Sequence, residues 1–274
     1  MLQEIEFESE NAILRGRFYK TADRPPCIVM AQGTSATITM AIDAVAEAIH
    51  AAGFSVLLYD HRNLGASDGE PRFQINPWIQ GRGYRDAVAY LRTRPDIDRI
   101  ALWGVSYSAM EVLVVGALID DIPAIVAQNP VCGMALPDMQ PSDTALTSLK
   151  SVFASGNVEG GPDSTVGPLP VVSADQINAP SLLKPIQAFR WFTEHGGRFD
   201  TKWENLASRV VPPTEVPFHP YLTAPYLTAL TLMMIGHHDE MEHCNPTAQR
   251  AVFERIAAPK ELFEIDGGHF GPLW

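Results

Sequence analysis

The chain has 274 residues and a mass of 30.0 kDa, and its 32 acidic residues outnumber its 20 basic residues, giving a net charge of −12 at pH 7. A hydrophobic fraction of 46% and a charged fraction of 19% are typical of a globular chain with a full core, and they exclude a disordered one. The acidic balance argues against binding to nucleic acid or to acidic membrane surfaces, because both need clustered cations.

Cysteine usage and the N-terminus bear on the compartment. Cys27, Cys132 and Cys244 are too few and too scattered for a disulfide framework. The first ten residues, MLQEIEFESE, have neither the basic start nor the apolar stretch of a signal peptide. No apolar run approaches the roughly 18 residues of a membrane-spanning helix. We therefore expect a cytoplasmic protein that does not enter a membrane.

The first half of the chain alternates short apolar segments with helical patterns. Ile5 and Phe7 alternate with glutamates, and a second apolar segment follows Asn11, which predicts an antiparallel hairpin. The elements predicted next are a strand at 27–31, a helix with Ile38, Ile42, Val45 and Ile49 that ends at Gly53, a strand at 54–59, a helix at 78–92, a strand at 99–103, a helix at 107–119 and a strand at 124–127. Apolar strands alternating with helices predict a mostly parallel sheet with helices on both faces.

The alternation stops in the segment 133–225, which is rich in proline and glycine and contains only two predicted helices, at 143–154 and 182–194. A long irregular segment inside a compact domain is typical of a lid or a binding segment. The pattern resumes with a strand at 231–235, a helix at 246–257 and a strand at 261–265. We expect one α/β core of residues 1–132 and 226–274, with residues 133–225 inserted as a lid after the sixth strand.

Ser106 is the candidate nucleophile. It lies in the sequence Gly104-Val105-Ser106-Tyr107-Ser108, between a predicted strand and a predicted helix. This is the context of a nucleophile elbow, in which small neighbours allow a sharp turn to pack closely. Ser108 replaces the usual second glycine and is also small. The helix N-terminus behind Ser106 favours developing negative charge.

A serine hydroxyl needs a base, and a base needs a partner that orients it. His269 is the candidate base, because the two glycines before it let its loop approach another backbone. Asp239 is the candidate partner, since it follows the first strand after the insertion and gives the order Ser, Asp, His. Glu240 is a neighbouring competitor. Asp266 is less favoured, because it lies in the same loop as His269.

An oxyanion formed at the substrate carbonyl needs two backbone donors. The N–H of Tyr107, the residue after the nucleophile, is expected to be the first. The second is expected from the loop after the strand at 27–31, and within that loop we select Thr34.

These segments resemble the three catalytic segments of the alpha/beta-hydrolase superfamily, and residues 60–71 are similar to the turn after its fourth strand. Within the superfamily, the chain is most similar to the dienelactone-hydrolase-like and X-Pro-dipeptidyl-peptidase-like group. The resemblance covers residues 1–132 and 226–271, and it implies an alpha/beta-hydrolase fold. Gln32 stands where many members have histidine. The chain also ends five residues after His269, where many members add a helix, which suggests a truncated or shortened C-terminus.

The expected activity is hydrolysis of an ester-like bond, in a carboxylic ester, a lactone or a thioester, through an acyl-enzyme on Ser106. The partner is a small-molecule substrate, and no cofactor is expected. A serine nucleophile argues against dehalogenase and epoxide hydrolase chemistry, which use aspartate. Three alternatives stay open: acyl transfer to an alcohol or amine in a natural-product pathway, amidase or peptidase activity, and a non-catalytic binding protein with the same fold. A homodimer is also left open.

Two further groups of residues need an interpretation. The segment 237–243 is rich in histidine and acidic residues, but it lacks an HExxH or His/Cys spacing, so no metal site is expected. Trp191 and Phe192 belong to an aromatic group in the insertion. They are expected either to pack the lid or to bind substrate by lining an apolar pocket.

Overall fold

The computed structural model describes residues 2–21 and 24–273. Its strands are β1 (Leu2–Ser9), β2 (Ala12–Tyr19), β3 (Cys27–Ala31), β4 (Ser55–Tyr59), β5 (Gln74–Ile75), β6 (Ile100–Val105), β7 (Ala124–Gln128), β8 (Thr165–Leu169), β9 (Ala207–Val210), β10 (Leu230–Gly236) and β11 (Lys260–Ile265). Its α-helices are α1 (Ile42–Ala51), α2 (Pro77–Arg92), α3 (Tyr107–Leu118), α4 (Asp143–Ser155), α5 (Ile186–Gly196), α6 (Pro220–Thr223) and α7 (Pro246–Arg255). Short 3-10 helices are η1 (Pro162–Ser164), η2 (Ala224–Tyr226) and η3 (Gly271–Leu273).

Eight strands form the main sheet, in the order β1-β2-β4-β3-β6-β7-β10-β11. β2 pairs antiparallel with β1 and with β4, and every pair from β4 to β11 is parallel. The predicted hairpin is confirmed. Ile5 and Phe7 are buried, whereas the glutamates between and around them are exposed. The parallel pairing from β4 to β11 also confirms the predicted, mostly parallel sheet.

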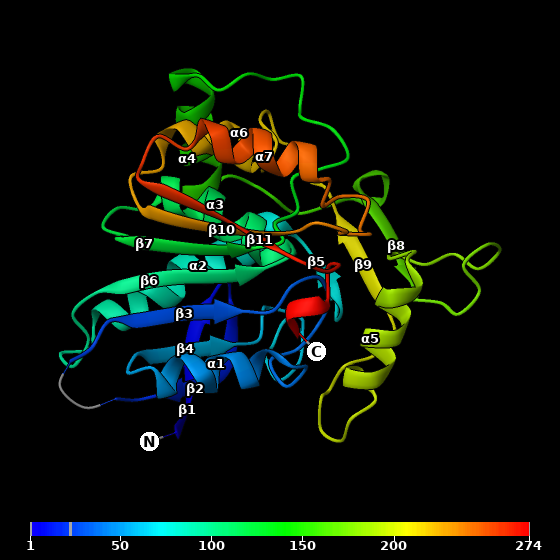
Figure 1. Ribbon diagram of the computed structural model, residues 1–274, viewed down its shortest axis with the longest axis horizontal. Coiled ribbons are helices and arrows are strands. Elements are labelled where there is room, and N and C mark those ends of the chain that lie inside the picture. The colour runs from blue at the N-terminus through cyan, green and yellow to red at the C-terminus, as the bar shows by residue number, and fades with distance from the viewer. Residues whose placement is uncertain (1, 22–23, 274) are drawn as a thin grey trace.

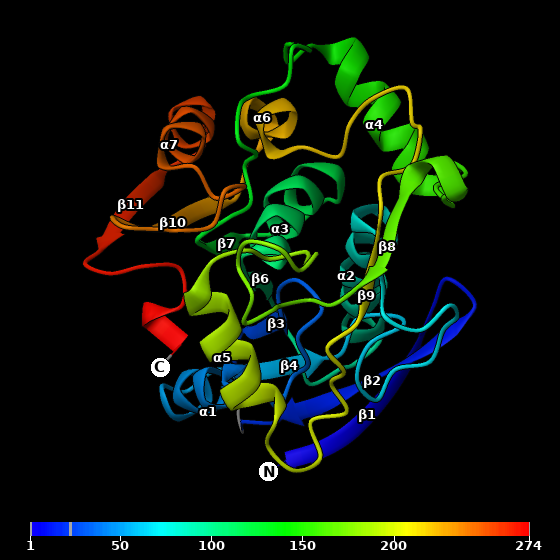
Figure 2. The ribbon, with the colours of Figure 1, turned by 90° about the vertical axis from the view of Figure 1, so that its right-hand side faces the viewer.

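Helices cover both faces of this sheet, because alternate side chains of its central strands belong to two separate cores. In β3, Val29 belongs to one core and Met30 to the other. The first core includes side chains of α2, α3, α4, α6 and α7, and the second includes side chains of α1 and α5. Figures 1 and 2 show α1 and α5 on one side of the sheet and α3 on the other. The predicted α/β architecture is confirmed, and it is the alpha/beta-hydrolase fold.

Two helices begin later than the periodicity predicts. α1 begins at Ile42, because residues 38–41 form turns and the backbone N–H of Ile38 donates to Asp60 Oδ1 at 2.9 Å. α5 begins at Ile186, because Leu182 and Leu183 donate their backbone N–H groups to residues 170 and 171 instead. In both cases, contacts distant in sequence replace the first predicted turn of the helix.

The segment 133–225 contributes to three parts of the structure. β8 and β9 join β5 in a second sheet of order β5-β9-β8, which was not predicted. Figure 1 shows this sheet beyond the carboxyl ends of the main strands, on the right. α4 and α6 pack near α3, whereas α5 packs against the opposite face of the main sheet. Of this segment, residues 182–185, 209–212, 214 and 217–219 line a cavity together with Ser106, and Trp191 and Phe192 of α5 line a smaller space beside it.

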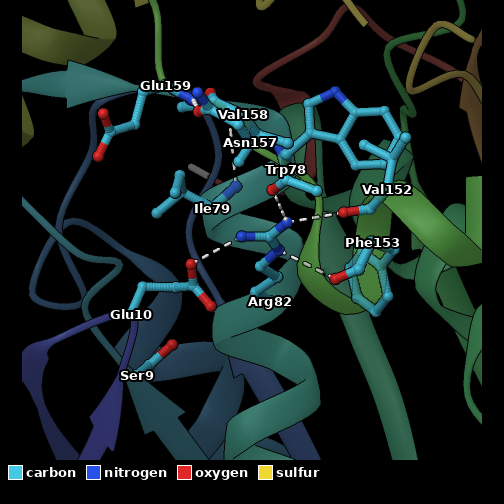
Figure 3. A network of polar contacts seen from close by, with 12 residues as sticks. Ser9, Glu10, Trp78, Ile79, Arg82, Val152, Phe153, Asn157, Val158 and Glu159 are labelled. Carbon is cyan, nitrogen blue, oxygen red and sulfur yellow. Dashed lines mark hydrogen bonds and ion pairs between the residues drawn. The ribbon is translucent and has the colours of Figure 1, made fainter. Parts of the chain in front are cut away.

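Arg82, on α2, attaches α4 to the core (Figure 3). Its Nε donates to the carbonyl of Phe153 at 3.0 Å, and its Nη2 donates to the carbonyls of Val152 and Gly156, both at 2.7 Å. Its Nη1 pairs with Glu10 at 2.8 Å. A buried cation thus adds donors to the carbonyls at the end of α4, where it also suits the negative end of the helix dipole.

The cysteines lie in the interior of the protein. Cys27, Cys132 and Cys244 are free and buried. Burial raises the pKa of the Cys27 thiol to about 12, so this thiol is neutral at pH 7. None of the helices in the described residues combines the length and the apolar composition needed to cross a membrane.

Candidate active site

Ser106 sits on a sharp turn between β6 and α3, with φ 59° and ψ −114°. A non-glycine residue rarely adopts this conformation, and such strain is concentrated at functional sites. A Cβ at Gly104 would lie 2.4 Å from the carbonyl carbon of Ser108, so only glycine fits there. The Ser106 N–H donates to the carbonyl of Gln128 at 2.8 Å. The turn therefore has the geometry of a nucleophile elbow.

The loop after β3 approaches Ser106 closely. A Cβ at Gly33 would lie 2.9 Å from the Ser106 Cβ, so this approach requires glycine. Thr34 and Ser106 line the same cavity. Within the described chain, no protein acceptor pairs with the backbone N–H of Thr34 or of Tyr107. Both predicted oxyanion donors are therefore free to bind a ligand oxygen.

Two acidic residues hold His269 in different ways. Its Nδ1 lies 2.7 Å from Asp239 Oδ2, and the two side chains are 3% and 0% exposed. Its backbone N–H donates to Glu240 Oε2 at 2.9 Å. Asp239 therefore orients the ring, and Glu240 fixes the loop. Asp266, the third acid considered, is exposed.

Ser106 and His269 line one small space of about 30 Å³. No hydrogen bond within the described residues joins the two side chains. In hydrolases without substrate this contact is often long, and it tightens when substrate binds. The arrangement leaves Nε2 of His269 as the ring nitrogen that is free to act on the serine, because Nδ1 contacts Asp239.

Asn129, at the end of β7, joins the strand ends to the histidine loop and was missed by the sequence reasoning. Its side-chain amide donates to the carbonyl of His269 at 2.9 Å, and its Oδ1 accepts from the N–H of Gly236 at 2.8 Å. Both bonds are buried. A polar residue directly after a buried strand was the available signal, but the sequence did not show what it would contact.

A second missed group lies buried beneath the elbow. The Ser108 hydroxyl donates to the carbonyl of Gln32 at 2.5 Å and lies 3.0 Å from His61 Nε2. His61 Nε2 is 3.3 Å from Glu111 Oε2, and these two side chains are 1% and 0% exposed. Ser108 and Gln32 are the two positions where the chain departs from the superfamily pattern, and here they contact each other.

Burial opposes charge on both ionisable members of this group. It lowers the pKa of His61 to about 3 and raises the pKa of Glu111 well above its usual value. His61 is therefore neutral at pH 7, and we take Glu111 to be protonated. The group acts through hydrogen bonds to the loop of Gln32, not through charge.

A cavity of about 590 Å³ opens over Ser106. This volume lies within the usual range for small-molecule sites, and the walls are mostly apolar, with Trp78, Met110 and Phe218 among them. Trp191 and Phe192 do not line this cavity. They are buried, and they line the small space that Ser106 and His269 also line. Trp191 stacks on Phe270 with ring centroids 5.2 Å apart. Contact of Trp191 and Phe192 with substrate stays a prediction.

One group in the described residues has possible ligand atoms near enough to one another to suggest a metal site. It consists of Asp239, Cys244 and His269, and these atoms all lie within 4.8 Å of one another. The Asp239–His269 separation of 2.7 Å is shorter than the about 3.3 Å expected between two ligands of a tetrahedral zinc. The spacing fits a hydrogen bond between a carboxylate and an imidazole.

The sequence and the fold were compared with those of known proteins. No protein-family model matches the chain. Thiohydrolase apmlB of Arthrinium phaeospermum is 38% identical over 131 residues, which cover 47% of this chain and 43% of that protein. Polyketide transferase af380 of Aspergillus fumigatus is 28% identical over 271 residues, which cover 97% of this chain and 89% of that protein. The solved alpha/beta hydrolase GrgF of Penicillium sp. sh18 has a TM-score of 0.73 at 22% identity, over 99% of this chain and 92% of that one. The chain therefore has the alpha/beta-hydrolase fold, and its sequence is similar to a thiohydrolase and to a polyketide transferase.

Proposed function

We propose that the chain is a serine hydrolase that cleaves a thioester or a carboxylic ester, including a lactone, through an acyl-enzyme on Ser106. The observation that carries the proposal is the position of Ser106, which sits on a strained elbow at the cavity. The His269–Asp239 pair lines the adjoining space. These residues supply the nucleophile, the base and the group that orients the base.

The first half-reaction forms the acyl-enzyme. His269 Nε2 takes the Ser106 proton as Oγ attacks the substrate carbonyl carbon, and Asp239 stabilises the resulting imidazolium. The N–H groups of Thr34 and Tyr107 bind the oxyanion. The intermediate then collapses, the carbon–sulfur or carbon–oxygen bond breaks, and the leaving thiolate or alkoxide receives the proton from His269.

The second half-reaction restores the enzyme. His269 removes a proton from water, and the hydroxide attacks the acyl carbon of the ester on Ser106. The bond to Oγ then breaks, and Oγ regains a proton from His269. The products are a carboxylic acid and a free serine, so no cofactor is needed.

The thioester is the first substrate class to test. A thiohydrolase is among the relatives, at 38% identity over its matched part, and a polyketide transferase matches almost the whole chain. The mostly apolar cavity suits an acyl chain. The test compares N-acetylcysteamine thioesters and p-nitrophenyl esters of graded chain length on the wild type and Ser106→Ala. Turnover that depends on Ser106 supports the proposal, and turnover that survives Ser106→Ala rejects it.

We also propose that part of the segment 133–225 acts as the lid over this site. Residues 182–185 and 209–219 contribute the walls of the cavity from this segment. The remainder, including α4 and α6, packs on the core. A lid confined to these walls would enclose the acyl group without a moving domain, and its admission or exclusion of water would favour hydrolysis or acyl transfer respectively.

Acyl transfer is the second candidate function, and the match to polyketide transferase af380 over 97% of this chain favours it. The chemistry differs only in the second half-reaction, where an alcohol or amine replaces water. The ratio of transfer product to free acid, measured with added alcohols, distinguishes the two. A free acid as the sole product would support hydrolysis, and a dominant ester product would support transfer.

A further inference from the structure

Arg209 is a cation on the wall of the cavity with no acidic partner. It lies on β9 and lines the cavity that contains Ser106. Its Nε is buried. Across residues 2–21 and 24–273, no hydrogen bond or ion pair to its guanidinium group is found. Sequence reasoning gave this residue no role.

Arg209 is half-buried, and its Nε is the atom that lacks both water and a partner within the described residues, which is unfavourable for the protein alone. Arginine keeps its charge in proteins, so it cannot relieve the loss of hydration by losing a proton. A charge removed from water costs free energy unless hydrogen bonds and an opposite charge replace the water. Arg82 shows how this chain satisfies a buried arginine, with three carbonyls and Glu10 as partners.

The other charged or titratable groups of the cavity do not neutralise Arg209. Lys184 is exposed and donates to the carbonyl of Ala179. Glu242, a carboxylate of the cavity wall, is exposed, and no ion pair joins it to Arg209 in the described chain. Burial lowers the pKa of His243, and the charge of Arg209 lowers it further, so this imidazole is neutral at pH 7.

The charge of Arg209 is felt by another residue of the cavity wall, Tyr107. Burial raises the pKa of the Tyr107 hydroxyl, and the positive charge of Arg209 opposes that rise. Arg209, Tyr107 and Ser106 line the same cavity, so an anionic group of a substrate bound there can reach the guanidinium.

We propose that Arg209 binds an anionic oxygen group of the substrate, a carboxylate or a phosphate, and so selects acidic acyl donors. This inference rests on the proposed function of Ser106. The planar guanidinium matches both groups in a bidentate geometry. The chain carries a net charge of −12, which repels anions at long range, so an anionic substrate needs a cation inside the cavity. Arg209 supplies it.

Two sources of the anion are distinguishable by experiment. Hexanoyl and adipoyl thioesters of N-acetylcysteamine have the same number of acyl carbons and differ in a terminal carboxylate. Hexanoyl-coenzyme A and hexanoyl-N-acetylcysteamine share the acyl group, and coenzyme A adds a longer leaving arm that carries the anionic phosphates. We would measure kcat/KM for these substrates with the wild type, Arg209→Gln and Arg209→Lys. The control is Arg190→Gln, because Arg190 is exposed on α5 and does not line the cavity.

The readout is the kcat/KM for the acidic substrate divided by the kcat/KM for the neutral substrate within each pair. We expect Arg209→Gln to lower one ratio by ~10- to 100-fold, the usual effect of losing a charged hydrogen bond, with Arg209→Lys in between. A fall in the adipoyl ratio identifies a carboxylate on the acyl chain, and a fall in the coenzyme A ratio identifies the phosphate arm. Unchanged ratios in Arg209→Gln, or an equal change in Arg190→Gln, would overturn the inference.

A binding measurement separates this inference from the proposed function. If the wild type cleaves none of these substrates, the proposed function fails, but calorimetric titration with adipate and with coenzyme A still tests Arg209. Binding of either compound that weakens in Arg209→Gln supports the site. Equal binding by both proteins, or none by the wild type, counts against it.

Discussion

Asp239 and Glu240 are neighbours with separate tasks at His269. Asp239 contacts the ring nitrogen, whereas Glu240 contacts the backbone. We expect Asp239→Asn to lower kcat by roughly 10³- to 10⁴-fold, because an amide favours the wrong tautomer of His269. Glu240→Gln keeps an acceptor oxygen for the backbone N–H, so its loss should be far smaller. Steady-state kinetics of the two variants decide the assignment, and the reverse order of effects would show that the acid is misassigned.

Ser108 connects the elbow to the oxyanion loop. Ser108→Ala leaves the Gln32 carbonyl and His61 Nε2 without this partner in a buried site, which should cost about 1–3 kcal/mol of unfolding free energy. We also expect kcat to fall more than KM changes, since the loop carries the Thr34 donor. Ser35→Ala is the control, because Ser35 is equally buried in that loop and its hydroxyl has no partner among the described residues. Equal effects in both variants would remove the role of the Ser108 hydroxyl.

Asp60 makes stability depend on pH in a defined direction. It accepts from the N–H groups of Ile38 and Ala66, both at 2.9 Å, but burial still raises its pKa from 3.8 to about 6. The folded state therefore holds this proton more tightly than the unfolded state. The contribution of Asp60 is fully present below pH 3.8 and is lost as pH rises through about 6.

The Asp60→Asn variant tests this dependence. Between pH 4 and pH 7, the unfolding free energy of the variant should fall by about 2 kcal/mol less than that of the wild type, because the amide does not titrate. Urea unfolding at several pH values measures the difference. Parallel stability curves for the two proteins would mean that Asp60 has an ordinary pKa.

At the scale of elements, Arg82 holds the end of α4 against α2 and the β1–β2 hairpin (Figure 3). Arg82→Met should cost about 1–3 kcal/mol, since it leaves the partly buried Gly156 carbonyl without this donor, while Arg85 still pairs with Glu10. Amide exchange should rise most at residues 143–158. Arg92→Met is the matched control on the same helix, because Arg92 makes one exposed bond, to the carbonyl of Asp120. Its effect should stay within about 0.5 kcal/mol, and a similar loss in both variants would contradict the anchoring role of Arg82.

The main sheet could be predicted from sequence because its signals are local. β3, β4, β6 and β7 are short and apolar on both faces, and helices of the right length separate them. The second sheet could not be predicted in this way. β5 has only two residues and pairs with β9, more than a hundred residues later, so no local pattern marks it.

For the molecule as a whole, the predicted site residues carry local sequence signals, whereas the missed ones depend on contacts between distant segments. Ser106, Asp239 and His269 each follow a predicted strand and carry recognisable neighbours, and the structure brings Asp239 and His269 into contact. Asn129 and His61 act through partners that are distant in sequence, and periodicity carries no information about such pairs. Arg209 was missed because its importance lies in partners that are absent from the described residues.

The central claim is that Ser106 carries the acyl group. The most direct test is to mix the protein with an acyl thioester, quench early in the reaction and locate the added mass by peptide mass spectrometry. The account predicts an acyl adduct on Ser106 that forms in the wild type, is absent from Ser106→Ala, and accumulates more slowly in Asp239→Asn. An adduct on another residue, or turnover of the thioester by Ser106→Ala at a rate within about tenfold of the wild type, would contradict it.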